Sequence, residues 1–209
     1  MLPPMDEARK VRDFWFGKTP LAPEQLLRRM ELWFGGGSAE LQQHVDNTLR
    51  ARFEPLVKSA IGGELAQWAD GPRRRLSLIL LLDQFPRNIY RGTPRAFAGD
   101  EQALSLALTG MQSVADAALN VAERIFFYMP LQHSESLEAQ EESVAAYKRL
   151  LGEAPDAIRS VFEGCVGYAE RHRAVIRQFG RFPHRNAVLG RPSTADEQAW
   201  LKQNGDSFG

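Results

Sequence analysis

The spacing of apolar residues along the chain is that of α-helices almost everywhere. Val11, Phe14 and Trp15 define one face of a first helix, which Gly17 can end. A second helix follows Ser38, a good N-cap residue. Its apolar face is formed by residues three or four apart, namely Leu41, Val45, Leu49, Phe53 and Leu56. Residues 73–84 are too apolar to show a single face, which is typical of a central helix buried on most sides.

Prolines and capping residues predict the ends of the helices in the middle of the chain. Asp100 can cap one helix, and another runs from about residue 116 to residue 128. We expect that helix to stop before Pro130, because the residue before a proline disfavours helical backbone. Ser134 or Ser136 can open the next helix.

Two further helices are expected toward the C-terminus. Pro155 suits the first turn of a long helix that ends near Phe179, with Gly180 beyond its last turn. Thr194 and Glu197 are spaced as a capping box for a last short helix. We find no run of alternating apolar and polar residues rich in β-branched side chains, so the fold class is all-α.

Short connections between consecutive amphipathic helices favour antiparallel helix pairs that stack in layers. The glycine-rich stretches 35–38 and 61–63 do not flank a self-sufficient core, so we treat them as loops. We therefore expect a single all-helical domain over residues 1–209.

The charge balance narrows the possible partners. Lys plus Arg and Asp plus Glu number 26 each, so no overall field steers the chain toward nucleic acid or an anionic membrane. The longest apolar run, LSLILLL at 76–82, is far shorter than the roughly 20 residues that span a bilayer. Cys165 is the single cysteine, which excludes an intramolecular disulfide and any cysteine-based metal cluster. With no signal-peptide pattern at its N-terminus, the chain is expected in the cytoplasm.

Two similar motifs stand about a hundred residues apart, DQFPRN at 83–88 and RFPHRN at 181–186. Phe85 and Phe182 each precede a proline and should mark points where the chain leaves a helix. Asn88 and Asn186 suit a left-handed backbone position or a side-chain turn. A structural role as a helix stop therefore explains the phenylalanines, prolines and asparagines.

That role does not explain the arginines of the two motifs, because a turn needs no guanidinium group. These are Arg87, Arg91, Arg95, Arg181, Arg185 and Arg191. One reading is that Arg87 or Arg185 pairs with Asp83, Glu123 or Glu135 and ties helix ends together. The other is that several arginines converge on an anionic ligand, since guanidinium presents a fixed fork of donors suited to carboxylate or phosphate.

The string YMPLQHSES at 128–136 adds a histidine beside a carboxylate. The dipole of the following helix is reason enough for Glu135, which would lie near its first turn. His133 with such a carboxylate has the ingredients of a general base and its orienting group, and His184 is a second candidate. Either histidine could instead bond to a backbone carbonyl. The four histidines show no metal-ligand spacing, so we expect neither a metal nor another cofactor.

Four strings together resemble a bacterial family known as domain-of-unknown-function family 924. They are VRDFWFG, LILLLDQFPRNIYRGTPRAFAGD, ERIFFYMPLQHSES and QFGRFPHRNAVLGRPST. The resemblance runs from about Val11 to the C-terminal helix. It implies an all-helical fold related to tetratricopeptide repeats, with antiparallel pairs in a right-handed superhelical arrangement. A strict 34-residue period is missing, so that relation would be degenerate. The resemblance implies no established reaction, substrate or cofactor.

Three functions remain open from the sequence, and the oligomeric state is not indicated. The first is a helical binding module with a polar pocket for a small anionic molecule or an acidic peptide end. The second is a hydrolase in which His133 or His184 activates water, Asp83 or Glu135 orients that histidine, and arginines stabilise negative charge. The third is a scaffold in which every charge is an internal tie. The candidate ligand-binding residues are Arg87, Asn88, Arg91, Tyr128, Arg181, Arg185, Asn186 and Arg191.

Overall fold

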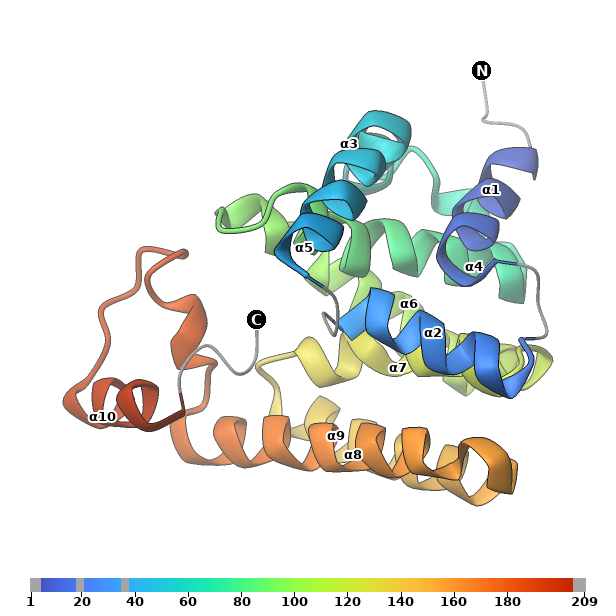
Figure 1. The fold of residues 1–209 in the computed structure, drawn as a ribbon. Helices are drawn as coiled ribbons and strands as arrows, with labels where there is room; N and C mark the ends of the chain where they lie inside the picture. The colour runs from blue at the N-terminus through green and yellow to red at the C-terminus, as the bar shows by residue number, and fades with distance from the viewer. Residues whose placement is uncertain (1–4, 18–20, 35–37, 205–209) are drawn as a thin grey trace.

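The computed structural model describes residues 5–17, 21–34 and 38–204, and these residues form helices joined by short turns, with no strand among them (Figure 1). The all-α fold class is therefore confirmed. Three residues of the glycine-rich stretch 35–38 lie outside the described part of the chain. The tetratricopeptide-like superhelical arrangement stays a prediction.

The longer elements follow one another in the order in which they are labelled. The α-helices are α1 (Met5–Phe16), α2 (Pro23–Phe34), α3 (Ala39–Ile61), α4 (Pro72–Ile79), α5 (Phe85–Ile89), α6 (Asp100–Gln112), α7 (Val121–His133), α8 (Leu137–Glu153), α9 (Arg159–Phe179) and α10 (Ala195–Asn204). The 3-10 turns are η1 (Ala66–Asp70), η3 (Pro94–Phe97), η4 (Ala115–Ala118), η5 (Asp156–Ile158) and η6 (Pro183–Arg185), and η2 (Leu80–Gln84) is a π turn. None of the described helices is long and apolar enough to cross a membrane.

The main core surrounds the segment formed by α4, η2 and α5. Residues 76–86 are buried throughout, and the largely apolar run at 76–82 predicts most of this burial. Helices α1, α6 and α7 pack against α4, while α3 packs against α5. Aromatic rings fill the space between these helices, with Trp15 in contact with both Phe85 and Phe126 at ring separations of 5.5 Å. Helices α7, α8 and α9 lie side by side and complete the core.

The C-terminal segment forms a second, smaller apolar cluster, which we call the C-terminal unit (residues 175–204). Val175, Ile176 and Phe182 are its buried members, and Phe179 and Trp200 pack against them. Figure 1 shows α10 set apart from the remaining helices. Polar contacts described below join this unit to the main core.

Several helix boundaries predicted from the sequence are confirmed. Ser38 accepts a hydrogen bond from the Leu41 N–H as the N-cap of α3. At the end of α9, Gly180 adopts the left-handed conformation with φ of 68°. Thr194 and Glu197 exchange the two hydrogen bonds of a capping box at the start of α10.

Other boundary predictions are wrong, and both concern prolines inside helices. Phe85 has helical backbone angles, so the chain does not leave the helix before Pro86. The reason is the π turn, closed by the Phe85 N–H on the Leu80 carbonyl, which changes the helical register where Pro86 lacks an N–H. Likewise α7 continues through Pro130 to His133, because buried packing on both sides of the proline holds the helix together.

The asparagines of the two motifs are also helical rather than left-handed. Asn88 lies within α5, and Asn186 has φ of −58° and ψ of −48°. Glycines four residues further along take the left-handed backbone instead, Gly92 with φ of 74° and Gly190 with φ of 65°. Asp100 does not cap α6 with its side chain, because its carboxylate is engaged elsewhere.

Candidate functional site

The π turn and a close approach of α6 bring two carboxylates together. Asp83 lies in the π turn, and Asp100 is the first residue of α6. Gly99 precedes Asp100 and lies so close to the Leu82 backbone that any Cβ atom would overlap the Leu82 carbonyl oxygen. A glycine is therefore required here so that the start of α6 can reach the π turn. π turns of this kind occur often at functional sites.

Asp83 is fully buried and bonds three neighbouring side chains. Its carboxylate lies 2.7 Å from His133 Nδ1, accepts a bond of 2.6 Å from Gln84, and lies 3.1 Å from Nη1 of Arg87. Burial acts to raise the pKa of Asp83, but Arg87 and His133 outweigh it and hold the pKa below its usual range. The carboxylate is therefore ionised, and it orients both the histidine and the guanidinium group.

Burial, followed by the positive charge of Arg87, lowers the pKa of His133, so its imidazole is neutral near pH 7. Because Asp83 can only accept, Nδ1 of the neutral ring carries the proton, and Nε2 is left as an acceptor. The His133 side chain retains 15% of its exposure, whereas Asp83 has none. This arrangement matches a general base with its orienting carboxylate.

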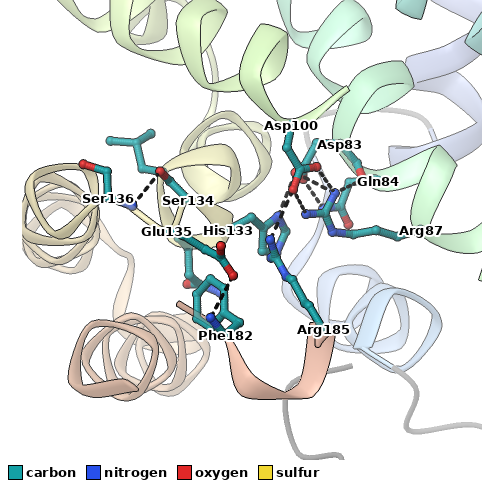
Figure 2. A network of polar contacts seen from close by, with 12 residues as sticks. Asp83, Gln84, Arg87, Asp100, His133, Ser134, Glu135, Ser136, Phe182 and Arg185 are labelled. Carbon is teal, nitrogen blue, oxygen red and sulfur yellow. Dashed lines mark hydrogen bonds and ion pairs between the residues drawn. The ribbon is translucent and has the colours of Figure 1, made fainter. Parts of the chain in front are cut away.

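Asp100 joins the two Phe-Pro motifs. Arg87 donates to it through two parallel bonds of 2.8 and 2.9 Å, and Arg185 approaches the same carboxylate at 3.4 Å (Figure 2). The two guanidinium groups thus converge, as the ligand-binding hypothesis requires. We call this group the Asp100 cluster; its members are Asp83, Arg87, Asp100, His133 and Arg185.

Arg185 is buried, with 7% exposure, and two aromatic rings contact its guanidinium group. Its guanidinium carbon lies 4.8 Å from the centre of the Phe97 ring and 4.6 Å from that of Phe182. Burial, followed by the charge of Arg87, lowers the pKa of Arg185 to about 10. Among the described residues its Nε has no hydrogen-bond partner, and its sole ion pair is the 3.4 Å contact with Asp100.

Glu135 fastens the C-terminal unit next to the Asp100 cluster (Figure 2). It accepts a hydrogen bond of 2.8 Å from the Phe182 N–H and two from Arg191, of 2.7 and 2.9 Å. Burial opposes ionisation, but the bonds from Arg191 and Phe182 hold the pKa of Glu135 below its usual range. Asn186 accepts a further bond from Arg191.

Two more histidines surround the Phe182 ring. His172 of α9 lies 5.5 Å from it and 6.4 Å from the His133 ring, and His184 lies 5.4 Å from it, centre to centre. Burial lowers the pKa of His172 to about 3. Burial and then the charge of Arg185 lower the pKa of His184 to about 4. Both rings are therefore neutral near pH 7.

Comparison with known proteins agrees with this all-helical architecture. Residues 11–205 match a family described as bacterial protein of unknown function, DUF924. The chain belongs to the DUF924 family. A solved structure of a protein of unknown function from Agrobacterium tumefaciens is 32% identical, with a TM-score of 0.77 over 95% of this chain and 98% of that one. No curated protein is similar enough to this DUF924 member to count as a match.

Six of the eight candidate ligand-binding residues of this DUF924 member are bonded outside the Asp100 cluster, among them Asn186 and Arg191, which bond to each other beside Glu135. Arg91 pairs with Asp46 of α3, at 3.1 Å. Asn88 accepts a bond from Gln42 of α3 and donates to the Gln84 carbonyl. The last two of the six are also held by local partners, Arg181 by Glu197 of α10 and Tyr128 by Asp116 of η4.

The proposed ties between helix ends are partly present. Arg87 does pair with Asp83, and Glu135 does bind an arginine, although that arginine is Arg191. Glu123 takes no part, because its carboxylate accepts the Asn120 N–H in the capping box of α7.

Sequence reasoning missed Asp100 and Phe97 in the DUF924 site. An aspartate before a helix is explained by capping alone, and a phenylalanine in an apolar setting by packing alone. The available signal was an excess of arginines over acidic residues within the two Phe-Pro motifs, which requires carboxylates and rings from elsewhere to accommodate them.

A hollow of about 540 Å³ lies elsewhere in the DUF924 member, lined by Lys10, Asp13, Phe14, Arg29 and Arg52. We do not assign the function to it, because its arginines already bind carbonyls or rings of α1 and α3. Within the described ranges, no three His, Cys, Asp or Glu side chains are grouped so as to hold a metal ion. Burial raises the pKa of the Cys165 thiol to about 12, which makes it a poor nucleophile.

Proposed function

We propose that the Asp100 cluster binds a small anion, either a free molecule or the acidic end of a peptide, and that Arg185 is the group that holds it. The observation that supports this proposal is the buried guanidinium group of Arg185, whose Nε has no hydrogen-bond partner in the described part of the chain. An unsatisfied buried donor costs free energy, and a charged one costs more. A bound anion would satisfy it.

Arg87 and Arg191 fit a supporting role better than a binding role. Each already forms two parallel bonds with a carboxylate, Arg87 with Asp100 and Arg191 with Glu135. These bonds fix the two carboxylates, and the carboxylates in turn hold the segments that carry Arg185 and Phe182. In the proposed site, the carboxylates of Asp100 and Glu135 are thus held in place, and the Arg185 guanidinium group keeps donors for a ligand.

The experiment compares wild type with Arg185→Lys and Arg185→Gln in a thermal-shift screen of acetate, glutarate, phosphate, sulfate and a short peptide ending in glutamate. At 100 times the Kd, a ligand should stabilise the wild type by about 2.7 kcal/mol. Neither variant should respond, because lysine lacks the fork of donors and glutamine lacks the charge.

Arg177→Lys serves as the matched control, since Arg177 is an exposed arginine of α9 that pairs with Glu141. This control should respond as the wild type does. If Arg185→Lys melts at a lower temperature while wild type and both variants respond equally to every anion, the scaffold function replaces the binding function.

Hydrolysis is a second candidate function, and the contact of 2.7 Å between His133 Nδ1 and Asp83 favours it. In this reading Nε2 of His133 takes a proton from water, and Arg185 stabilises negative charge that develops on the substrate. His184 is the other candidate base, and its pKa of about 4 makes it the weaker proton acceptor near pH 7.

This candidate is tested by turnover of ester, amide and phosphoester libraries with wild type, His133→Gln and His184→Gln. Loss of turnover in His133→Gln alone would support His133 as the base. Equal turnover in all three proteins would refute histidine catalysis. The cytoplasmic location and the single domain stay predictions from the sequence.

A further inference from the structure

The geometry around Arg185 leaves one edge of its guanidinium group for a ligand. The rings of Phe97 and Phe182 both contact the guanidinium group, and its Nη1 donates to Asp100. The remaining edge carries Nε and Nη2. Neither atom has a hydrogen-bond partner among the described residues. Two N–H groups of one edge lie in the same plane, and their spacing fits two oxygens bound to one central atom.

The charges next to this edge are balanced. The three guanidinium groups of Arg87, Arg185 and Arg191 are matched by the three carboxylates of Asp83, Asp100 and Glu135. The neighbouring rings of His133, His172 and His184 add no charge near pH 7, because burial lowers the pKa of each. With no surplus positive charge here, each negative charge of a ligand is opposed by Asp100 and Glu135, so a dianion is opposed more strongly than a monoanion.

We infer that the ligand of this site is a small carboxylate monoanion, bound side-on by the Nε–Nη2 edge of Arg185 near the Phe97 and Phe182 rings. This inference rests on the proposed anion-binding function and narrows it to one chemical class. The apolar rings beside the edge suit the carbon skeleton that a carboxylate carries, whereas inorganic phosphate and sulfate have no apolar part.

The test measures dissociation constants of acetate, propionate, inorganic phosphate and sulfate by isothermal titration or NMR at pH 8 and constant ionic strength. At this pH phosphate is mostly a dianion. Wild type should bind propionate at least about tenfold more tightly than phosphate or sulfate, since the fork of donors suits all four but the local charge opposes a dianion more strongly than a monoanion. Arg185→Lys should abolish this preference by weakening propionate binding at least about tenfold.

Asp100→Asn provides the sharpest comparison, because it removes one of the two carboxylates that oppose a dianion and keeps the side-chain shape. It should narrow the difference between propionate and phosphate several-fold by tightening phosphate binding. Arg177→Lys is the control for an arginine-to-lysine change and should leave every dissociation constant unchanged. Circular dichroism of each variant verifies that the helices are retained.

The possible results separate the inference from the function on which it rests. Phosphate binding as tight as propionate binding, lost in Arg185→Lys, would overturn the carboxylate class and keep the anion site. If Asp100→Asn leaves the ratio of the propionate and phosphate dissociation constants unchanged, the argument from local charge is overturned. Absence of Arg185-dependent binding for all four anions would overturn both the inference and the proposed function.

Discussion

The two Phe-Pro motifs look alike in sequence but hold their arginines in opposite ways. In the first, Phe85 stays helical within a buried stack, and Arg87 is bonded to two carboxylates. In the second, Phe182 is extended with φ of −89° and ψ of 107°, and Arg185 is left with one long contact. The same residues therefore complete a rigid core in one place and leave a donor unused in the other.

The π turn explains this difference. It precedes Pro86 and shifts the helical register where that proline lacks an N–H, so that the helix continues. Arg87 therefore lies one turn after Asp83, within reach of its carbonyl and its carboxylate. Pro183 instead follows Gly180, whose left-handed backbone has already ended α9. Neither proline therefore acts as the helix stop that the sequence predicts.

The largest expected loss of stability comes from removing Asp83 of the first motif. Asp83→Ala should lower the free energy of unfolding by about 3–5 kcal/mol, because His133 loses its buried partner and Arg87 loses one of its two carboxylates. Urea denaturation measures it. Asp46→Ala is the matched control, since its partner Arg91 is half exposed, and it should cost about 1 kcal/mol or less. Equal losses in the two variants would show that burial of the first motif is not what distinguishes it.

A smaller effect should follow from Gly99→Ala, which pushes α6 away from the π turn. We expect a loss of about 1–3 kcal/mol because the new methyl group overlaps the Leu82 backbone. Gly152→Ala in α8 has open space around it and should instead stabilise the protein by about 0.5–1 kcal/mol. Both values come from the same urea titration, and a neutral Gly99→Ala would contradict the close approach.

Lowering the pH should act on the second motif through the two histidines that lie beside its Phe182 ring, His172 and His184. Their pKa values, about 3 for His172 and about 4 for His184, lie below the ordinary value of about 6.5 in the unfolded chain. Between about pH 6.5 and pH 4, the unfolded chain therefore binds protons at these histidines that the folded protein does not bind. Above pH 6.5 these histidines do not reduce the free energy of unfolding. As the pH drops toward 4, the free energy of unfolding falls by roughly 1.4 kcal/mol per pH unit for each such histidine.

His172→Leu should reduce this slope by one proton, as measured by urea denaturation at several pH values. The urea m-value should stay constant, so that the change reports protons and not the surface exposed on unfolding. An unchanged slope would show that His172 is protonated in the folded protein.

The smallest expected loss of stability comes from removing the cap residue of either capping box. Thr194→Ala at α10 and Asn120→Ala at α7 should each cost about 1 kcal/mol locally. Because α10 belongs to the C-terminal unit, Thr194→Ala should raise amide exchange in α10 and leave the main core protected. Asn120→Ala should lower protection across α7 and its neighbours. Identical exchange patterns would show that the two regions unfold together.

The sequence predicts the fold more fully than the site because helices are local and the site is not. Apolar spacing and capping residues located most of the helices, including the capping box of Thr194 and Glu197, but α2 was not predicted. The convergence of Arg87 and Arg185 was one of two open readings, and it depends on Asp100, which lies 13 and 85 residues from them. The π turn at Asp83 left no local signal, because its apolar residues fit an α-helix equally well.

The placement of Trp200 has a practical consequence for fluorescence. Among the four tryptophans of the chain, Trp200 lies in α10 and packs against Phe179, whereas Trp15, Trp33 and Trp68 belong to the main core. A variant that keeps Trp200 and carries phenylalanine at the other three positions would emit from the C-terminal unit alone. Its spectrum would show directly when a solute alters that unit while the rest of the molecule stays folded.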